Sequence, residues 1–193
     1  MKNITILYIP GLGGRYDRLR RIALVSWRIF GVKACLVPMN WYDGKPLAEK
    51  MVRVEEALKS AGKSTPVAIV GESAGASIAL LAATKYKNIH TLITICGVTR
   101  PTTPISPYLQ YRAPALPEAV AQLDGIALAS SLSIHSLRSW YDPVVGKEYS
   151  TAPTAKVHTL LTPGHLFTIL CCLTVFSGYV VRLTRNKAHL SPL

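Results

Sequence analysis

Ser73 is the residue of this sequence whose surroundings best suit nucleophilic chemistry. It lies at the centre of a G-x-S-x-G pattern, Gly71 to Gly75, which follows the apolar run 67–70 and precedes a helical pattern rich in alanine and leucine. Between a strand and a helix, such a turn strains the backbone and lifts the serine Oγ above the sheet, and the start of the helix points N–H groups toward a developing oxyanion. These residues could also form an ordinary glycine-rich turn of a doubly wound protein, but the strand before them and the helix after them favour a nucleophile.

A serine hydroxyl needs a general base, and the base needs a carboxylate that orients it. Beyond Ser73 the acids are few: Glu118, Asp124, Asp142 and Glu148. Asp142 directly follows an expected strand, and catalytic groups gather at the carboxyl ends of strands in open α/β sheets. The next residue, Pro143, holds Asp142 away from the helical region. Asp124 precedes Gly125 and has the character of a turn or capping residue, so Asp142 is the predicted acid.

The candidates for the base are the histidines after Asp142: His158, His165 and His189. His158 lies inside an expected strand and would point to a face of the sheet rather than to its rim. His189 lies in a polar segment near the end of the sequence. His165 follows the last expected strand and precedes a helix, which makes it the predicted base.

The loop after the first expected strand, residues 9–14, contains glycines that allow backbone N–H groups to face Ser73. We expect the amides of Leu12 and Ala74 to form the oxyanion hole. A dinucleotide-binding loop is the alternative for this glycine pattern, but G-x-G-x-x-G needs a glycine where the sequence has Tyr16. The chemistry expected of these residues requires no metal and no cofactor.

Apolar runs with the length of buried strands recur along the chain, and their continuous apolar character is typical of a sheet covered on both faces. They are residues 4–9, 32–38, 66–70, 90–96, 132–140 and 156–161. Helical patterns lie between them at 16–30, 47–62 and 74–86. This order predicts an α/β fold, a three-layer sandwich with a mostly parallel, doubly wound sheet of about six strands.

The first helical pattern, 16–30, combines apolar and basic residues. Its apolar residues have near-helical spacing: Leu19, Ile22, Ala23, Trp27 and Phe30. Its arginines are expected elsewhere on the helix: Arg18, Arg20, Arg21 and Arg28.

A proline-rich segment follows the fourth expected strand. Because prolines block regular structure, we expect an ordered loop or a small cap at about residues 99–130, with a helical pattern at 118–129 that Gly125 interrupts. Tyr108 and Tyr111 lie among the prolines, and we assign them to substrate binding together with Trp41.

Residues 166–181 carry no charge and are followed by the basic residues Arg182, Arg185 and Lys187. One helix of this length would extend roughly 24 Å, short of the ~30 Å hydrocarbon core of a bilayer. Because it begins directly after His165, we expect it to pack on the sheet. A helix that is apolar on every side can also bury its outer face in a homodimer or in an anionic membrane surface, and the basic flank and the arginine-rich first helix favour the membrane.

Composition limits the class of protein. With 193 residues, of which 49% are hydrophobic and 17% charged, we expect a single domain over residues 1–193 and neither a disordered chain nor a coiled coil. The net charge of +12 comes from scattered residues, and no nucleic-acid-binding module is present, so we expect no nucleic-acid partner.

The cysteines and the first residues indicate the compartment. Cys35, Cys96, Cys171 and Cys172 form no C-x-x-C pair and no zinc-binding pattern, which fits free thiols. The apolar run 4–9 is shorter than that of a signal peptide and ends in Pro10-Gly11. We therefore expect a cytoplasmic protein.

The sequence resembles the α/β-hydrolase superfamily of serine hydrolases over roughly residues 4–182. The motifs that carry the resemblance occur in the order of the family: Pro10-Gly11-Leu12-Gly13-Gly14, Gly71-Glu72-Ser73-Ala74-Gly75, Asp142-Pro143-x-Val145 and Gly164-His165. The resemblance implies hydrolysis of an ester, thioester or amide through an acyl-enzyme, on a sheet of order 2-1-3-4-5-6. Pro10 stands where the family usually has histidine, and the chain begins at the third strand of the family, which leaves little room for a large lid.

Two classes of function remain. The first is a carboxylesterase or lipase-like serine hydrolase that acts on a small-molecule acyl ester through Ser73, His165 and Asp142. The second is a non-catalytic binding module of the same fold with a basic, membrane-contacting surface. The presence of all three residues in the order of the family favours the enzyme.

Overall fold

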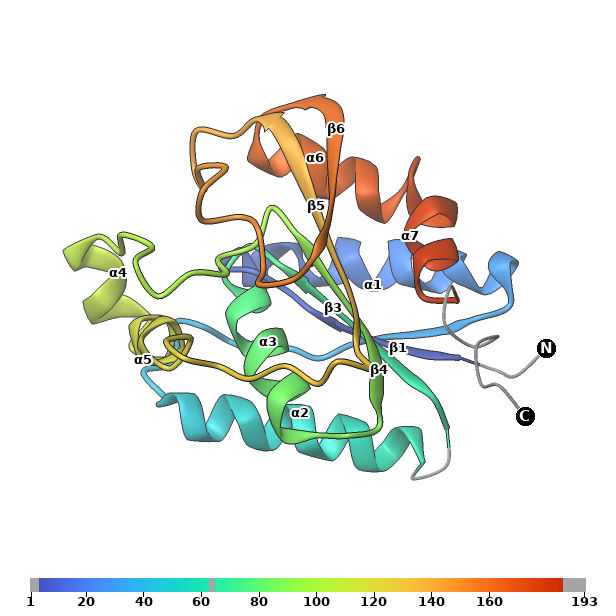
Figure 1. The fold of residues 1–193 in the computed structure, drawn as a ribbon, viewed down its shortest axis with the longest axis horizontal. Helices are drawn as coiled ribbons and strands as arrows, with labels where there is room; N and C mark the ends of the chain where they lie inside the picture. The colour runs from blue at the N-terminus through green and yellow to red at the C-terminus, as the bar shows by residue number, and fades with distance from the viewer. Residues whose placement is uncertain (1–3, 63–64, 186–193) are drawn as a thin grey trace.

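The computed structural model describes residues 4–62 and 65–185. Its centre is a sheet of six strands, all parallel, in the order β2-β1-β3-β4-β5-β6 (Figure 1). This result confirms the predicted strand order and the doubly wound α/β class. The strands are β1 (Thr5–Ile9), β2 (Lys33–Leu36), β3 (Val67–Glu72), β4 (Ile89–Ile95), β5 (Ser133–Tyr141) and β6 (Lys156–Pro163).

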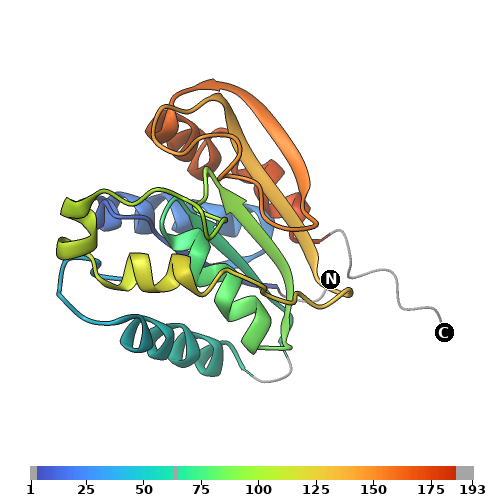
Figure 2. The same ribbon diagram turned by 60° about the vertical axis from the view of Figure 1, so that its left-hand side comes forward.

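Helices cover both faces of the sheet (Figures 1 and 2). One face is covered by α1 (Asp17–Ser26), the 3-10 helix η2 (Trp27–Phe30), α6 (His165–Leu173) and α7 (Ser177–Leu183). The other face is covered by α2 (Leu47–Ala61), α3 (Gly75–Lys85) and α5 (Ala115–Ala121). Strand β1 supplies both cores, because successive side chains of a strand point to opposite faces. Its Ile6 and Tyr8 pack in the first layer, and its Leu7 and Ile9 pack in the second.

The loops that carry the predicted site residues leave the sheet at one edge. Ile9 ends β1, Glu72 ends β3, Tyr141 ends β5 and Pro163 ends β6. Because the strands are parallel, their four carboxyl ends lie on the same side of the sheet, and the residues that follow them meet there.

Helix α1 differs from its prediction in the residue that it buries. Arg20 is only 6% exposed, whereas Leu19 and Ile22 are each 63% exposed. The cause is the carboxylate of Glu72, which is 1% exposed and ion-paired with Arg20, because a buried carboxylate requires a cation or hydrogen-bond donors. The expectation that the arginines of this helix lie away from its packed side is therefore wrong for Arg20.

The single helix predicted over 166–181 is wrong, since the chain forms two helices, α6 and α7, bent by 76°. At the break, the Thr174 hydroxyl donates a hydrogen bond to the carbonyl of Leu170 at 2.7 Å, a side-chain contact that bends helices. In residues 4–62 and 65–185 no single helix is long and apolar enough to cross a membrane, and α6 with α7 reaches that length only as this bent pair.

The proline-rich segment is more regular than predicted. It contains α4 (Pro107–Arg112), which Ser106 caps by accepting a hydrogen bond from the Leu109 amide, and α5, which begins at Ala115 rather than at residue 118. Pro107 and Pro117 lie in the first turns of these helices, where the missing N–H of proline costs nothing. The predicted helix 118–129 is wrong at its far end, since α5 ends at Ala121 and Gly125 has a φ of 64°.

Candidate active site

Ser73 occupies a sharp turn between β3 and α3. Its φ is 49°, in the left-handed region that costs a residue with a side chain roughly 1–2 kcal/mol. Two hydrogen bonds to β4 and the loop after it hold this conformation: the Ser73 amide donates to Ile95 at 2.9 Å, and the Val98 amide donates to the Ser73 carbonyl at 2.9 Å. The strain is therefore maintained by the neighbouring strand.

The glycines around Ser73 allow backbone segments to approach one another. A Cβ added at Gly75 would lie 2.3 Å from the carbonyl oxygen of Ile9, and one added at Gly11 would lie 2.8 Å from the Ser73 Cβ. Both distances are shorter than real contacts of a Cβ atom. The loop after β1 can lie against the serine turn only because these positions lack side chains.

Ser73, His165 and Asp142 form one chain of hydrogen bonds. His165 Nε2 lies 2.9 Å from Ser73 Oγ, and His165 Nδ1 lies 2.8 Å from Asp142 Oδ2. Asp142 immediately follows β5, and His165 is the first residue of α6, after Gly164 with a φ of 83°. The three residues that the sequence analysis selected are thus brought together by three separate loops.

The surroundings of Asp142 favour its ionised form. Burial opposes ionisation, but hydrogen bonds from His165 and from the amides of Val145 and Val144 lower the pKa of Asp142 below its ordinary value. Both amides donate to Oδ1, at 3.0 and 2.8 Å, which leaves Oδ2 for His165. A fixed carboxylate at this position selects the tautomer that carries its proton on Nδ1 and leaves Nε2 able to accept the serine proton.

Cys96 lies beside this chain. Its Sγ and the nearest ligand atoms of Asp142 and His165 lie within 4.8 Å of one another. Burial, together with the negative charge of Asp142, raises the pKa of the Cys96 thiol to about 12. Because metals and electrophiles react with the thiolate, the neutral thiol at this position suits packing better than metal binding.

The predicted oxyanion residues, Leu12 and Ala74, lie in the loop after β1 and in the serine turn. Within the described residues the amides of Leu12 and Ala74 donate no hydrogen bond to the protein, whereas the Gly11 amide donates to Glu72 at 3.1 Å. Ala74 precedes α3, so its amide belongs to the positive end of that helix. Neither amide is therefore committed to an acceptor within the described residues.

A buried ionic network that was not predicted from the sequence lies behind this loop. Glu72 accepts hydrogen bonds from Tyr8 Oη, from the Gly11 amide and from Nε and Nη2 of Arg20. Arg20 Nη1 in turn donates to the Gly13 carbonyl at 2.6 Å and to Asp17 at 2.9 Å. The network therefore fixes both ends of the segment that carries the Leu12 amide. The acid next to Ser73 was the available signal, but a single sequence does not show that its side chain points inward.

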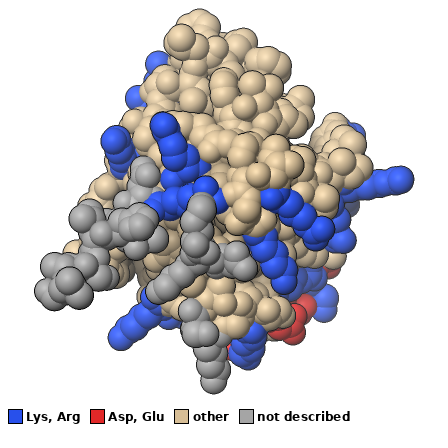
Figure 3. Space-filling view, turned by 90° about the vertical axis from the view of Figure 1, so that its right-hand side faces the viewer, with Lys and Arg blue, Asp and Glu red and all other residues tan. Residues whose placement is uncertain are grey.

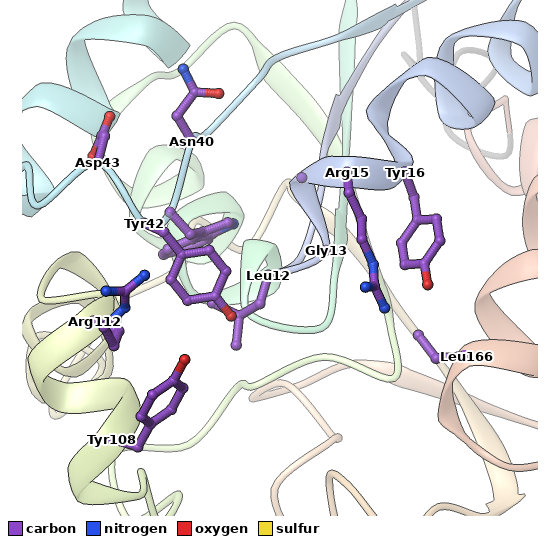
Figure 4. Close-up of a pocket in the computed structure, with 12 residues that line it drawn as sticks. Leu12, Gly13, Arg15, Tyr16, Asn40, Tyr42, Asp43, Tyr108, Arg112 and Leu166 are labelled. Carbon is purple, nitrogen blue, oxygen red and sulfur yellow. The ribbon is translucent and has the colours of Figure 1, made fainter.

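An open cavity of about 790 Å³ is lined by Leu12 and by Leu166, the residue after His165, whereas the three hydrogen-bonded residues themselves do not line it. Figure 4 shows Leu12, Tyr42 and Tyr108 around its centre, with Leu166 at the side of α6. Of the predicted substrate-binding residues, Tyr108 and Trp41 line the cavity, whereas the exposed Tyr111 is not among its lining residues. Trp41 is buried, and its Nε1 donates to the Pro10 carbonyl at 3.0 Å, so it also supports the loop after β1.

Comparisons with known proteins support the fold. No family model and no curated protein matches the sequence. Solved structures match at low identity, among them Est1E from Butyrivibrio proteoclasticus (TM-score 0.63, 16% identity, covering 94% of this chain and 88% of that one). Human thioesterase 2 matches with a TM-score of 0.65 and 14% identity, over 99% of this chain and 100% of that one. The α/β hydrolase GrgF from Penicillium sp. sh18 matches with a TM-score of 0.66 and 10% identity, over 96% of this chain and 90% of that one. The chain has the α/β-hydrolase fold.

In this α/β-hydrolase fold the other titratable candidates lie away from Ser73. His158 is in β6, as predicted, where it contacts His135 Nδ1 at 3.0 Å and Tyr179 Oη at 2.7 Å. Asp124 lies in the exposed turn after α5. His189 and Lys187 lie outside the described residues.

Proposed function

We propose that this α/β-hydrolase-fold protein is a serine hydrolase that cleaves carboxylic esters through an acyl-enzyme. The observation that carries the proposal is the continuous chain from Ser73 Oγ through His165 to Asp142, with distances of 2.9 and 2.8 Å. The printed names of the structural neighbours, which include esterases, a lipase and a thioesterase, favour the same class of chemistry.

In the proposed reaction, Ser73 Oγ attacks the carbonyl carbon of the ester while His165 Nε2 takes the hydroxyl proton. The tetrahedral oxyanion accepts hydrogen bonds from the Leu12 and Ala74 amides. Collapse of this intermediate breaks the bond to the alcohol, which receives the proton from His165 and leaves an acyl-Ser73. Water then attacks the acyl group, His165 again transfers the proton, and the carboxylic acid and free Ser73 are released. Asp142 stabilises the imidazolium in both steps without taking its proton.

The test is labelling of the folded protein with a fluorophosphonate probe, which forms a covalent bond only with an activated serine. We expect labelling of the wild type and none of Ser73→Ala. Ser77→Ala is the matched control, because Ser77 is a buried serine of α3 whose hydroxyl bonds to the Ala74 carbonyl, and this variant should label normally. Absence of labelling in correctly folded wild-type protein would refute the enzyme and favour a non-catalytic binding module.

A series of p-nitrophenyl esters of increasing acyl length, with a matched thioester, then defines the substrate. The open cavity lined by Tyr108 and Trp41 has room for an acyl group. We expect hydrolysis of the oxygen esters above the rate measured without enzyme only in variants that retain Ser73.

A further inference from the structure

Helices α1 and α6 present an apolar surface to solvent. The residues of this surface are each more than half exposed: Leu19, Ile22, Leu166, Phe167 and Leu170. Between the two helices lies a groove of about 440 Å³, which Leu19, Ile22, Leu166 and Leu170 help to line. We call these residues and the groove the α1–α6 face. Large apolar side chains gathered in this way mark a surface that binds another apolar surface.

The α1–α6 face is continuous with the candidate active site. Tyr16 and Leu166 line both the groove and the cavity beside the triad. Leu166 directly follows His165, so the face begins one residue from the proposed base. A molecule bound to the face therefore lies beside the residue that follows the proposed base.

Basic residues predominate around the face. Exposed arginines accompany the apolar residues of α1 and the turns that flank it: Arg15, Arg18, Arg21 and Arg28. The only acid between residues 14 and 30 is Asp17, which is paired with Arg20, and the sequence has no acid after Glu148. On the side of the molecule where α1 ends and α7 lies, the charged side chains in view are also mostly lysine and arginine (Figure 3).

We infer that the α1–α6 face binds the surface of an anionic lipid bilayer and that the substrate is an acyl ester of an amphiphile held in that bilayer. This inference rests on the proposed function for the reaction, but not for the binding. Apolar side chains enter the boundary between headgroups and acyl chains, and the arginines meet the lipid phosphates. A second copy of the chain is the less suitable occupant, because a two-fold dimer would place one row of arginines against another.

The binding test uses the full chain carrying Ser73→Ala and vesicles of phosphatidylcholine, either alone or with 30% phosphatidylglycerol added. We expect co-flotation with the anionic vesicles only, and release at high salt because added ions screen the arginines. Each arginine near an anionic surface changes the partition coefficient about five-fold, so Arg18→Gln with Arg21→Gln should weaken binding about 25-fold. The charge-matched control, Lys87→Gln with Lys156→Gln, removes two exposed charges from other elements and should bind as the parent does.

The apolar arm of the test replaces Ile22 and Leu170 with glutamine. We expect binding at least about ten-fold weaker, because each leucine-sized side chain loses its burial in the bilayer. Val52→Gln with Leu161→Gln is the matched control, since both residues are exposed and lie on α2 and β6, away from the face. Equal loss in the control, or equal binding of the parent to neutral vesicles, would overturn the inference. Formation of a dimer by the parent that is lost in the Ile22/Leu170 variant would also overturn it, in favour of a second copy.

Activity separates this inference from the proposed function. With Ser73 restored, the Ile22/Leu170 variant should hydrolyse a soluble p-nitrophenyl butyrate at the wild-type rate and an ester lipid in anionic vesicles at least about ten-fold more slowly. Hydrolysis of the soluble ester without any vesicle binding refutes the docking surface and leaves the hydrolase. Vesicle binding without hydrolysis or probe labelling refutes the hydrolase and leaves the docking surface.

Discussion

The ionic network behind the oxyanion loop makes Glu72→Gln an informative substitution. Each carboxylate oxygen of Glu72 accepts two hydrogen bonds: Oε1 from the Gly11 amide and Arg20, and Oε2 from Tyr8 Oη and Arg20. A glutamine of the same shape must put its NH₂ group where two donors already point. It also leaves the Arg20 guanidinium without its main counterion.

The size of the effect follows from these contacts. Removing one partner of a buried ion pair costs about 3–5 kcal/mol, and we expect about 3 kcal/mol because Asp17 still pairs with Arg20 at 2.9 Å. For a domain of this size that loss lowers Tm by roughly 6–12 °C. Because the Gly11 amide loses its carboxylate acceptor, and Arg20, which donates to the Gly13 carbonyl, loses its anchor, we expect the Leu12 amide to be displaced. The loss of one oxyanion donor costs about 10²–10³ in kcat, and a displaced donor should cost about 10- to 100-fold.

The assays are thermal unfolding and esterase kinetics at a temperature where all variants are folded. Leu24→Ala is the matched control, because Leu24 is a buried residue of the same helix outside the network, and its truncation costs about 2–5 kcal/mol. It should lower Tm comparably and leave kcat unchanged. If Glu72→Gln keeps the wild-type kcat, or if Leu24→Ala loses as much activity, the network does not position the oxyanion loop. A Tm unchanged in Glu72→Gln would refute the energetic reasoning itself.

Three further predictions follow from the site and the sheet. Asp142→Asn should lower kcat/KM roughly 10³- to 10⁴-fold with an unchanged circular dichroism spectrum, because the wrong tautomer of His165 is stabilised; a loss below ten-fold would contradict this role. Gly75→Ala should lower the free energy of unfolding in urea by ~1–3 kcal/mol or more, because its Cβ would lie 2.3 Å from the Ile9 carbonyl oxygen. Gly14→Ala is the control: a Cβ there meets open space, so this variant should keep the wild-type stability. Burial is the main cause that lowers the pKa of His135 to about 4, and the charges of His158 and Lys156 lower it further. A histidine of the unfolded chain has a pKa of about 6.5. Between pH 6.5 and 4 the unfolded state therefore binds a proton on His135 that the folded state does not bind, and the free energy of unfolding should fall as the pH drops through this range. His135→Gln should show a shallower pH dependence of urea unfolding, and an unchanged dependence would be evidence against this assignment.

The sequence was sufficient to predict the sheet and the three residues that the structure joins by hydrogen bonds, Ser73, His165 and Asp142. Strands that are apolar throughout and alternate with helices have few possible arrangements, and catalytic side chains then follow strand ends. Asp142 and His165 were therefore predictable from their places after β5 and β6, even though His165 and Ser73 are 92 residues apart. The scarcity of acids after Ser73 narrowed the choice of the residue that orients His165.

The features that the sequence did not reveal depend on contacts between distant segments. Arg20 is buried because it pairs with the buried carboxylate of Glu72, 52 residues away, and periodicity within α1 contains no trace of that partner. At the break after α6, the hydroxyl of Thr174 bonds back into the helix. A run of uncharged residues does not show where such a bend occurs. The exposure of Leu19 and Ile22 on α1 could not be predicted either, because it follows from the burial of Arg20 on the packed side of that helix.

The position of β6 has a consequence for the order in which activity and structure are lost. This strand pairs with β5 alone, at the end of the sheet, and leads directly into His165, so the proposed base depends on an edge strand. Edge strands open at a lower free energy than central ones, and local opening here separates His165 from Ser73 while β1, β3 and β4 remain paired. On warming, hydrolysis should therefore fade before the sheet melts, in step with deuterium uptake by the amides of β6.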